Sequence, residues 1–116
     1  MSNFIQGKIW GATRLIFSND TTEVHRIDIK PGGYCSRHRH KSKSNMFFVE
    51  LGQLEVLVWR DGKPDTTILH EGEQTTVEAG VTHQFQTDRA CIAYEIYQVR
   101  IDPSDIDRET RGGIHA

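Results

Sequence analysis

Three histidines fall in two short segments whose composition indicates turns and strands. His38 and His40 are separated by one residue and follow the turn-forming segment Pro31-Gly32-Gly33, and His83 lies 43 residues beyond His40. In an extended strand side chains alternate between faces, so His38 and His40 would point the same way, about 7 Å apart. Neutral imidazole nitrogens bind first-row transition metals. The spacing therefore predicts a mononuclear metal site built from His38, His40 and His83.

Asn45, five residues after His40, is a further candidate in this site. Its carbonyl oxygen could ligate the ion or accept a hydrogen bond from a metal-bound water, and the alternative is a turn residue without a ligand. Three neutral imidazoles leave a divalent ion with its full charge, which makes it a strong Lewis acid. We expect one divalent transition metal, and Zn, Ni, Fe, Cu and Mn all remain open.

Two residues outside the ligand set could move protons. His25 alternates in phase with Ile27 and Ile29, so it could face the interior and act as a proton donor or acceptor, or be only a half-buried histidine. Glu95 shares a face with Tyr97, while the neighbouring Tyr94 points the other way. Only one of these faces can line a cavity. His25 and Glu95 are the candidate catalytic residues.

Arginines and cysteines near the histidines add weaker possibilities. Arg26, Arg37 and Arg39 could form a cationic rim for a phosphate or carboxylate, although Arg37 and Arg39 should point away from the histidines. Cys35 lies three residues before His38 and could line the same cavity. Cys35 and Cys91 form no CxxC motif, and we expect free thiols rather than a disulfide.

The composition restricts the class of protein. A chain of 116 residues with 36% hydrophobic and 26% charged residues predicts a single globular domain, residues 1–116. The formal net charge of −2 gives no reason to expect nucleic acid as a partner. No apolar run reaches the roughly 20 residues that span a bilayer, and no signal-like segment opens the chain, so we expect no membrane association and a cytoplasmic location.

Short strands separated by glycine-containing turns predict an all-β fold. Alternating or apolar runs indicate seven strands: 14–18, 23–30, 46–51, 53–59, 66–70, 74–78 and 90–100. The run 46–51 is mostly apolar, as expected for a strand buried on both faces. Asp61-Gly62 indicates a hairpin. The only helical signal is one possible turn over 103–108. Such a pattern favours a sandwich or barrel.

The two histidine segments resemble the paired motifs of the cupin superfamily. The first motif is matched by Gly32, five residues, His38-Arg39-His40, four residues, Asn45, six residues and Gly52. The second is matched by Gly72, five residues, Glu78-Ala79-Gly80, two residues and His83. Asn45 stands where the family has a ligating Glu, and Glu78 where it has Pro. The resemblance implies a small double-stranded β-helix, a jelly-roll barrel over about residues 7–100 with a C-terminal extension, 101–116.

Further segments are similar to the cupin domain of type II mannose-6-phosphate isomerases. They are Lys8-Ile9-Trp10-Gly11, the run 25–32, Glu95-Ile96-Tyr97 and the run 104–109. That family usually has Gln where this chain has His38, has His at His40, and has Glu-His where this chain has Asn45-Met46. The absence of this acidic ligand argues against isomerase activity.

Three kinds of function follow from these predictions. The first is a metal-dependent enzyme acting on a sugar, a sugar phosphate or a similar small polar substrate, either an isomerase or, with ferrous iron at three histidines, a dioxygenase. The second is a non-catalytic cupin that binds a sugar or another small molecule. The third is a structural dimer without a ligand. The resemblance also implies a homodimer, which would cover a sheet edge.

Overall fold

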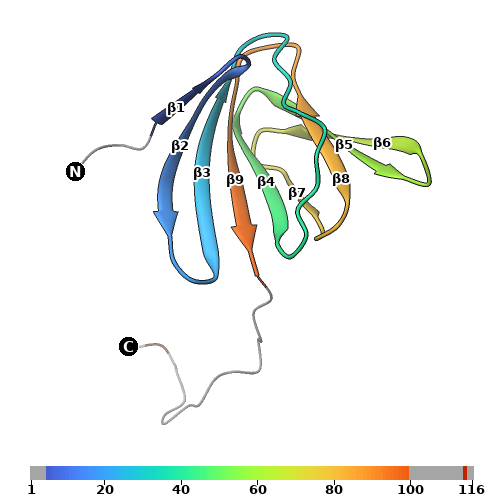
Figure 1. Ribbon diagram of the computed structural model, residues 1–116. Coiled ribbons are helices and arrows are strands. Elements are labelled where there is room, and N and C mark those ends of the chain that lie inside the picture. The colour runs from blue at the N-terminus through green and yellow to red at the C-terminus, as the bar shows by residue number, and fades with distance from the viewer. Residues whose placement is uncertain (1–4, 100–113, 115–116) are drawn as a thin grey trace.

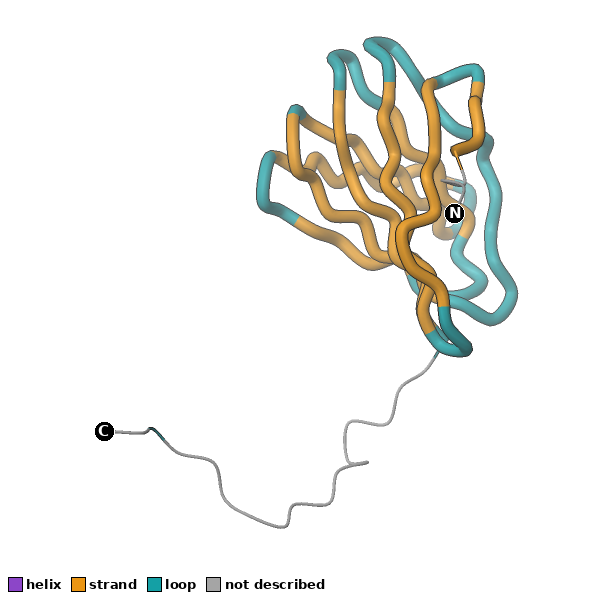
Figure 2. The backbone as a smooth tube through the Cα atoms, turned by 90° about the vertical axis from the view of Figure 1, so that its left-hand side faces the viewer, coloured by secondary structure: helices purple, strands orange, loops and turns teal. Residues whose placement is uncertain are grey.

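The computed structural model describes residues 5–99 and 114, and in them the chain forms nine antiparallel β-strands and no helix (Figures 1 and 2). The strands are β1 (Ile5–Lys8), β2 (Gly11–Ser18), β3 (Thr22–Ile29), β4 (Ser44–Leu51), β5 (Gln53–Arg60), β6 (Lys63–His70), β7 (Gln74–Val77), β8 (Thr82–Gln86) and β9 (Cys91–Gln98). No helix long and apolar enough to cross a bilayer occurs in this described part of the chain.

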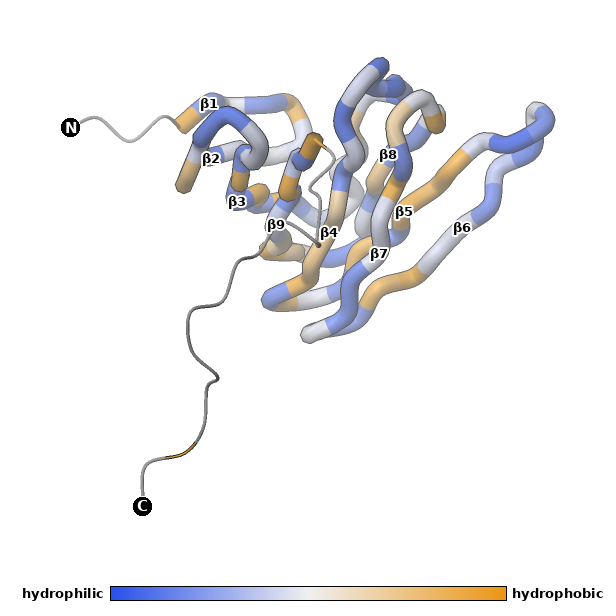
Figure 3. The backbone as a smooth tube through the Cα atoms, turned by 90° about the horizontal axis from the view of Figure 1, so that it is seen from below, coloured by the Kyte–Doolittle hydropathy of each residue, from blue (hydrophilic) through white to orange (hydrophobic). Residues whose placement is uncertain are grey.

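The strands form two facing sheets, which is the jelly-roll arrangement that the resemblance implies. One sheet has the order β1-β2-β3-β9-β4-β7 and the other the order β6-β5-β8. Figure 3 shows the two sheets curving away from their junction, with the β5–β6 hairpin extending outward to a hydrophilic tip. The turn of that hairpin contains Asp61 and Gly62, both with positive φ, as the sequence indicates.

The core lies between the sheets and changes from apolar to polar along the strands. On β3 the inward residues Ile27 and Ile29 are almost fully buried and belong to the apolar core. The same face continues to Glu23 and His25, which line a pocket. The inward face of β9 likewise runs from Cys91 and Ala93 in the core to Glu95 and Tyr97 at the pocket. Because adjacent strands pair in register, the polar ends of β3 and β9 lie side by side, with Glu23 opposite Tyr97 and His25 opposite Glu95.

Two expectations about the strands are corrected. The run 46–51 is not buried on both faces, because Phe47 and Val49 are buried whereas Phe48 and Leu51 on the same strand are exposed. β4 belongs to a sheet with one face open, so its outward apolar residues gave a misleading pattern. Two strands were not predicted. The four residues of β1 are all exposed and show no alternation, and β8 begins in a segment whose glycine indicates a turn. The possible helical turn at 103–108 lies outside the described residues.

A long connection between β3 and β4 carries the first histidine pair. It runs beside β8 without becoming a continuous strand, and it pairs there at two isolated bridges, Tyr34 with Gln86 and His38 with His83. Gly33 begins this connection at a place with no room for a side chain, because a Cβ would lie 2.9 Å from the carbonyl oxygens of both Lys30 and Trp10. Close backbone packing therefore fixes where the segment starts.

Candidate metal centre

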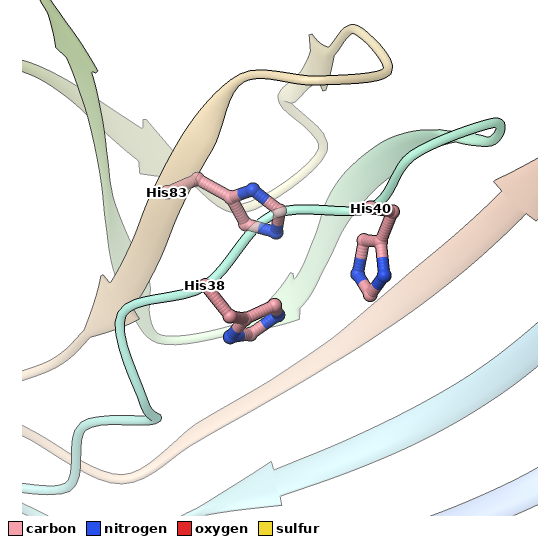
Figure 4. Close-up of side chains that lie close together, drawn as sticks. All are labelled: His38, His40 and His83. Atoms are coloured by element: carbon pink, nitrogen blue, oxygen red, sulfur yellow. The ribbon is translucent and has the colours of Figure 1, made fainter.

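The three predicted histidines come together. One ring nitrogen of each of His38, His40 and His83 lies within 4.8 Å of the other two. Figure 4 shows His38 and His40 projecting from the connection and His83 from β8, with the three rings turned toward one shared space. The ring centroid of His38 lies 5.0 Å from the ring centroid of His40 and 4.7 Å from that of His83. Convergence of three imidazoles from segments 43 residues apart is the arrangement that a mononuclear site requires.

Main-chain hydrogen bonds hold the backbone at all three positions. His38 and His83 exchange two backbone bonds, from His38 N to His83 O at 3.0 Å and from His83 N to His38 O at 2.8 Å. The carbonyl of His40 accepts a bond from the Gly80 amide at 2.7 Å. The spacing of the imidazoles is therefore set by backbone pairing.

Hydrogen bonds from the ring nitrogen Nδ1 to main-chain carbonyls orient two of the rings. The Nδ1–H of His38 donates to the carbonyl of Ser36 at 2.7 Å, and the Nδ1–H of His83 donates to the carbonyl of Val81 at 2.9 Å. Each bond assigns the proton to Nδ1, so Nε2 carries the free lone pair. Such second contacts are the usual way in which ligating histidines are held.

The electrostatics favour neutral imidazoles. Burial, reinforced by the proximity of His38, Lys43 and His83, lowers the pKa of His40 to about 4. Burial also lowers the pKa of His83, despite its bond to the Val81 carbonyl. Both rings are therefore uncharged at neutral pH, which is the form that binds metal.

The residues present fit a transition metal. The Nε2 of His40 and the Oδ1 of Asn45 are buried and have no hydrogen-bond partner among the described residues. Buried polar atoms without a partner are rare because losing hydration costs about 1–3 kcal/mol. An ion among the three imidazoles would satisfy the His40 nitrogen, and the nitrogen-rich donor set suits Zn, Ni, Cu, Fe or Mn.

Asn45 lies beside the histidines with its amide nitrogen toward them. Its Nδ2 donates to a carboxylate oxygen of Glu95 at 3.0 Å and lies 3.1 Å from Nε2 of His83. A carboxylate only accepts hydrogen bonds, so the contact with Glu95 fixes the orientation of the amide. The NH₂ group therefore faces the same His83 lone pair that an ion would use, and Oδ1 is the only atom of Asn45 able to ligate.

A pocket of about 320 Å³ adjoins the histidines and contains both candidate catalytic residues. His25 and Glu95 line it, together with His38 and Tyr97. The Nε2 of His25 lies 2.5 Å from a carboxylate oxygen of Glu23. The Tyr97 ring contacts both His25 and His40. Its centroid lies 5.7 Å from that of His25 and 5.1 Å from that of His40. The Glu95–Tyr97 face, and not the Tyr94 face, therefore lines the cavity.

Three pocket residues were not singled out from the sequence. Glu23 orients His25, Ser36 orients His38, and the ammonium of Lys43 lies 4.1 Å from the centre of the Tyr97 ring. Period two along β3 links Glu23 to His25 and was the available signal for Glu23. A carbonyl contact such as that of Ser36 leaves no signature in residue type.

Cys35 also lines the pocket, but its chemistry is that of a buried thiol. Burial raises the pKa of Cys35 to about 12, so the sulfur stays protonated. Its Sγ accepts a hydrogen bond from the Phe85 amide at 3.2 Å. Cys35 and Cys91 are both buried and free, as the sequence predicts.

Comparisons with solved structures agree with this architecture. Oxalate decarboxylase of Bacillus subtilis, a protein with Mn(II) centres, superposes with a TM-score of 0.75 over 84% of this chain and 27% of its own, at 15% identity. KdgF from Halomonas sp. superposes with a TM-score of 0.70 over 84% of this chain and 87% of its own, at 14% identity. At these identities the likeness shows the fold alone.

Sequence comparison supplies the family. A curated relative, mannose-1-phosphate guanylyltransferase of Sinorhizobium fredii (strain NBRC 101917 / NGR234), is 28% identical over 75 residues, which are 65% of this chain and only 14% of that protein. The model of the cupin domain family matches residues 25–97, more than half of the 116 residues. This match includes all three histidines and both candidate catalytic residues. The chain belongs to the cupin family.

Proposed function

We propose that this cupin is a metal-dependent enzyme that isomerises a sugar or sugar phosphate. The observation that carries the proposal is the convergence of three imidazoles, one of which, His38, lines a pocket that also contains two candidate proton-transfer groups, His25 and Glu95. The relative named for mannose 1-phosphate supports a sugar phosphate as the substrate class. When bound, the metal would polarise the substrate carbonyl and the neighbouring hydroxyl. His38, His40 and His83 would hold it. Ligation by Asn45 Oδ1 is part of the same proposal, and it would require the amide to turn away from its contact with Glu95.

Glu95 is suited to the role of base at carbon. It is only 8% exposed, and Asn45 holds its carboxylate at the edge of the histidine cluster. In aldose–ketose isomerisation a proton leaves the carbon next to the carbonyl and returns to the former carbonyl carbon. One carboxylate that takes the proton and gives it back accomplishes both transfers without an oxidant.

His25 is suited to proton transfer between the substrate oxygens. Glu23 lies 2.5 Å from one ring nitrogen, and Thr13 Oγ1 lies 3.4 Å from the other. The imidazole is thereby oriented in the pocket wall, and it could receive the hydroxyl proton and deliver a proton to the former carbonyl oxygen. With Glu95 at carbon and His25 at oxygen, the hydrogen balance of the reaction closes within the pocket.

Deuterium exchange tests the reaction. The full chain, purified without chelator and without nickel resin, is analysed for metal and incubated with mannose 6-phosphate in deuterium oxide. We expect about one metal per chain and metal-dependent deuterium at the carbon next to the carbonyl, with no oxygen uptake at an electrode. Glu95→Gln should lower the exchange rate roughly 100-fold or more. Exchange that is absent from metal-loaded protein would refute an isomerase acting on that substrate.

Two alternatives differ in their readout. A non-catalytic binding cupin is favoured by Asn45 standing at the acidic ligand position, and it predicts metal-dependent sugar binding without exchange. A three-histidine iron dioxygenase predicts oxygen consumption. A homodimer, a cytoplasmic location and the absence of nucleic-acid and membrane partners belong to the same proposal as predictions.

A further inference from the structure

A second hollow of about 750 Å³ lies outside the pocket, between β1 with its turn and the start of the connection that follows β3. Figure 1 shows these two segments at the same end of the molecule, at the top of the view. We call this hollow the basic groove. Its lining, in the described part of the chain, contains three cationic residues, Lys8, Lys30 and Arg37, and no aspartate or glutamate.

The cations of the basic groove have no acidic partner among the described residues. The ion pairs of the described residues involve Arg26, Arg89, His25 and His70. None of them includes Lys8, Lys30 or Arg37. A cluster of three cations stands out in a chain whose formal net charge is −2. Together they produce a local positive potential that attracts an anion with more than one charge.

Aromatic side chains accompany these charges. Tyr34 lines the basic groove and is 65% exposed, so its ring is available for stacking. Trp10 lines it as well and is fixed by an edge contact with Phe85 at 5.0 Å. The Arg37 guanidinium lies 4.1 Å from the centre of the Trp59 ring, which restrains it at the end of the segment. An anionic group joined to a ring matches this combination better than a free inorganic ion does.

The basic groove and the pocket at the metal centre adjoin each other. Both are lined by Lys8, Trp10, Cys35 and Ser36. Ser36 also orients His38, so one segment borders both spaces. A ligand that extends across this shared border would have its sugar carbons in the pocket and its charged end in the basic groove.

We infer that the basic groove binds the phosphate or diphosphate ester of a sugar whose reactive carbons lie in the pocket. The inference rests on the proposed function for the sugar half of that ligand, and the anion site itself depends only on Lys8, Lys30 and Arg37. Lysine and arginine together are suited to phosphate oxygens, with arginine contributing a two-pronged donor and lysine a compact charge.

Titration with inorganic pyrophosphate tests the anion site apart from the metal. Amide resonances of the metal-free full chain are followed by NMR at fixed ionic strength, since pyrophosphate would otherwise bind directly to a metal ion. We expect saturable shifts confined to residues 30–37 and to Lys8. The double variant Lys30→Gln/Arg37→Gln should bind at least tenfold more weakly, because each lost charge-assisted hydrogen bond weakens binding by about that factor.

The matched control removes the same charges elsewhere. Arg60→Gln/Lys63→Gln changes two exposed cations at the β5–β6 hairpin and should leave the affinity unchanged. Equal weakening in both double variants, or shifts spread over the whole surface, would overturn the inference. Metal content and isomerisation are measured separately. Pyrophosphate binding with no isomerisation leaves the anion site standing and rejects only the proposed reaction, whereas isomerisation with no groove binding does the reverse.

Discussion

At the scale of single residues, Asn45 distinguishes this site from one with an acidic ligand. Its amide lies between the Glu95 carboxylate and the His83 imidazole, 3.0 Å from one and 3.1 Å from the other. A carboxylate at position 45 would face Glu95 directly, and two like charges at that distance cannot both be ionised without cost. The chain thus keeps one carboxylate near the histidines, supplied by β9 instead of β4.

Substitution of Asn45 tests this exchange of carboxylates. We expect Asn45→Glu to lower the free energy of unfolding of metal-free protein by about 3 kcal/mol, because it adds an uncompensated buried charge. The double variant Asn45→Glu/Glu95→Gln should recover most of the loss, and Asn45→Gln serves as the uncharged control. Urea unfolding of metal-free protein measures the effect. A single variant as stable as the wild type would show that the two side chains do not interact.

Removal of ligands has a direct control in the same chain. His38→Ala and His83→Ala should each weaken metal binding roughly 100-fold or more while the strands stay folded, since losing a ligand weakens binding more than losing a residue that only orients one. His70→Ala, at an exposed histidine on β6, should keep full metal content. Elemental analysis and circular dichroism provide the readout. Full metal content in both ligand variants would contradict the assignment.

The lowered pKa of His40 predicts a pH dependence of folding. In the unfolded chain this histidine titrates near 6.5, and in the folded metal-free chain near 4. Between these values the unfolded chain binds a proton that the folded chain does not, so the stabilisation is complete above pH 6.5 and is lost as the pH falls toward 4. Urea unfolding at pH 5 and pH 7 should show lower stability at pH 5. His40→Gln should reduce that difference, and an unchanged difference would exclude His40 as its source.

The sequence predicts which residues form the site better than it predicts how their side chains contact one another. Metal-ligand chemistry and spacing along the chain predict that His38, His40 and His83 come together, and in the structure they do. The contact of Asn45 with Glu95 joins residues on different strands, and it depends on the register of β4 with β9 and on one amide orientation. Neither is encoded in the spacing along a single segment, so the role of Asn45 could not be predicted.

At the scale of elements, the alternation of apolar and polar residues predicted most strands. It failed where both faces of a strand carry the same kind of residue. β3 alternates buried and half-buried residues near its end, and its bounds are predicted within one residue at each end. β4 has apolar residues on both faces, so residue type alone could not indicate that Phe48 is exposed. β1 is four exposed residues paired only with β2, and its existence depends on that pairing.

The connection after β3 depends on Gly33. An alanine Cβ at this position would lie 2.8 Å from the Ile29 side chain as well as close to two carbonyl oxygens. We expect Gly33→Ala to lower the free energy of unfolding by roughly 1–3 kcal/mol, as overpacking does, and to weaken metal binding by shifting the segment with His38. Gly7→Ala, where nothing lies within 4 Å of the added carbon, should change stability by less than about 1 kcal/mol. Equal effects of the two substitutions would contradict this view of the connection.

At the scale of the whole molecule, we predict that two copies associate through the outer face of the larger sheet, and not through a sheet edge. Phe48 is 36% exposed there, and its ring centroid lies 6.5 Å from that of Tyr94. Met46 and Ile96 pair beside them on the same face. Apolar side chains gathered on one sheet face commonly mark an interface.

Light scattering coupled to size exclusion tests the homodimer. We expect twice the chain mass of 13.3 kDa, reduced to the monomer mass by Phe48→Lys. Ile68→Lys, at a residue 48% exposed on the other sheet, is the control and should remain dimeric. A wild-type monomer at micromolar concentration would reject the homodimer.

The backbone bridge between His38 and His83 makes the framework of the site independent of which side chains act as ligands. Main-chain atoms fix these two positions, and the Gly80 amide fixes the third at His40. Replacement of one imidazole by another donor would leave these bonds intact. Over evolutionary time such a scaffold can accept different ligand side chains, and hence different metals and reactions, without having to refold around each change.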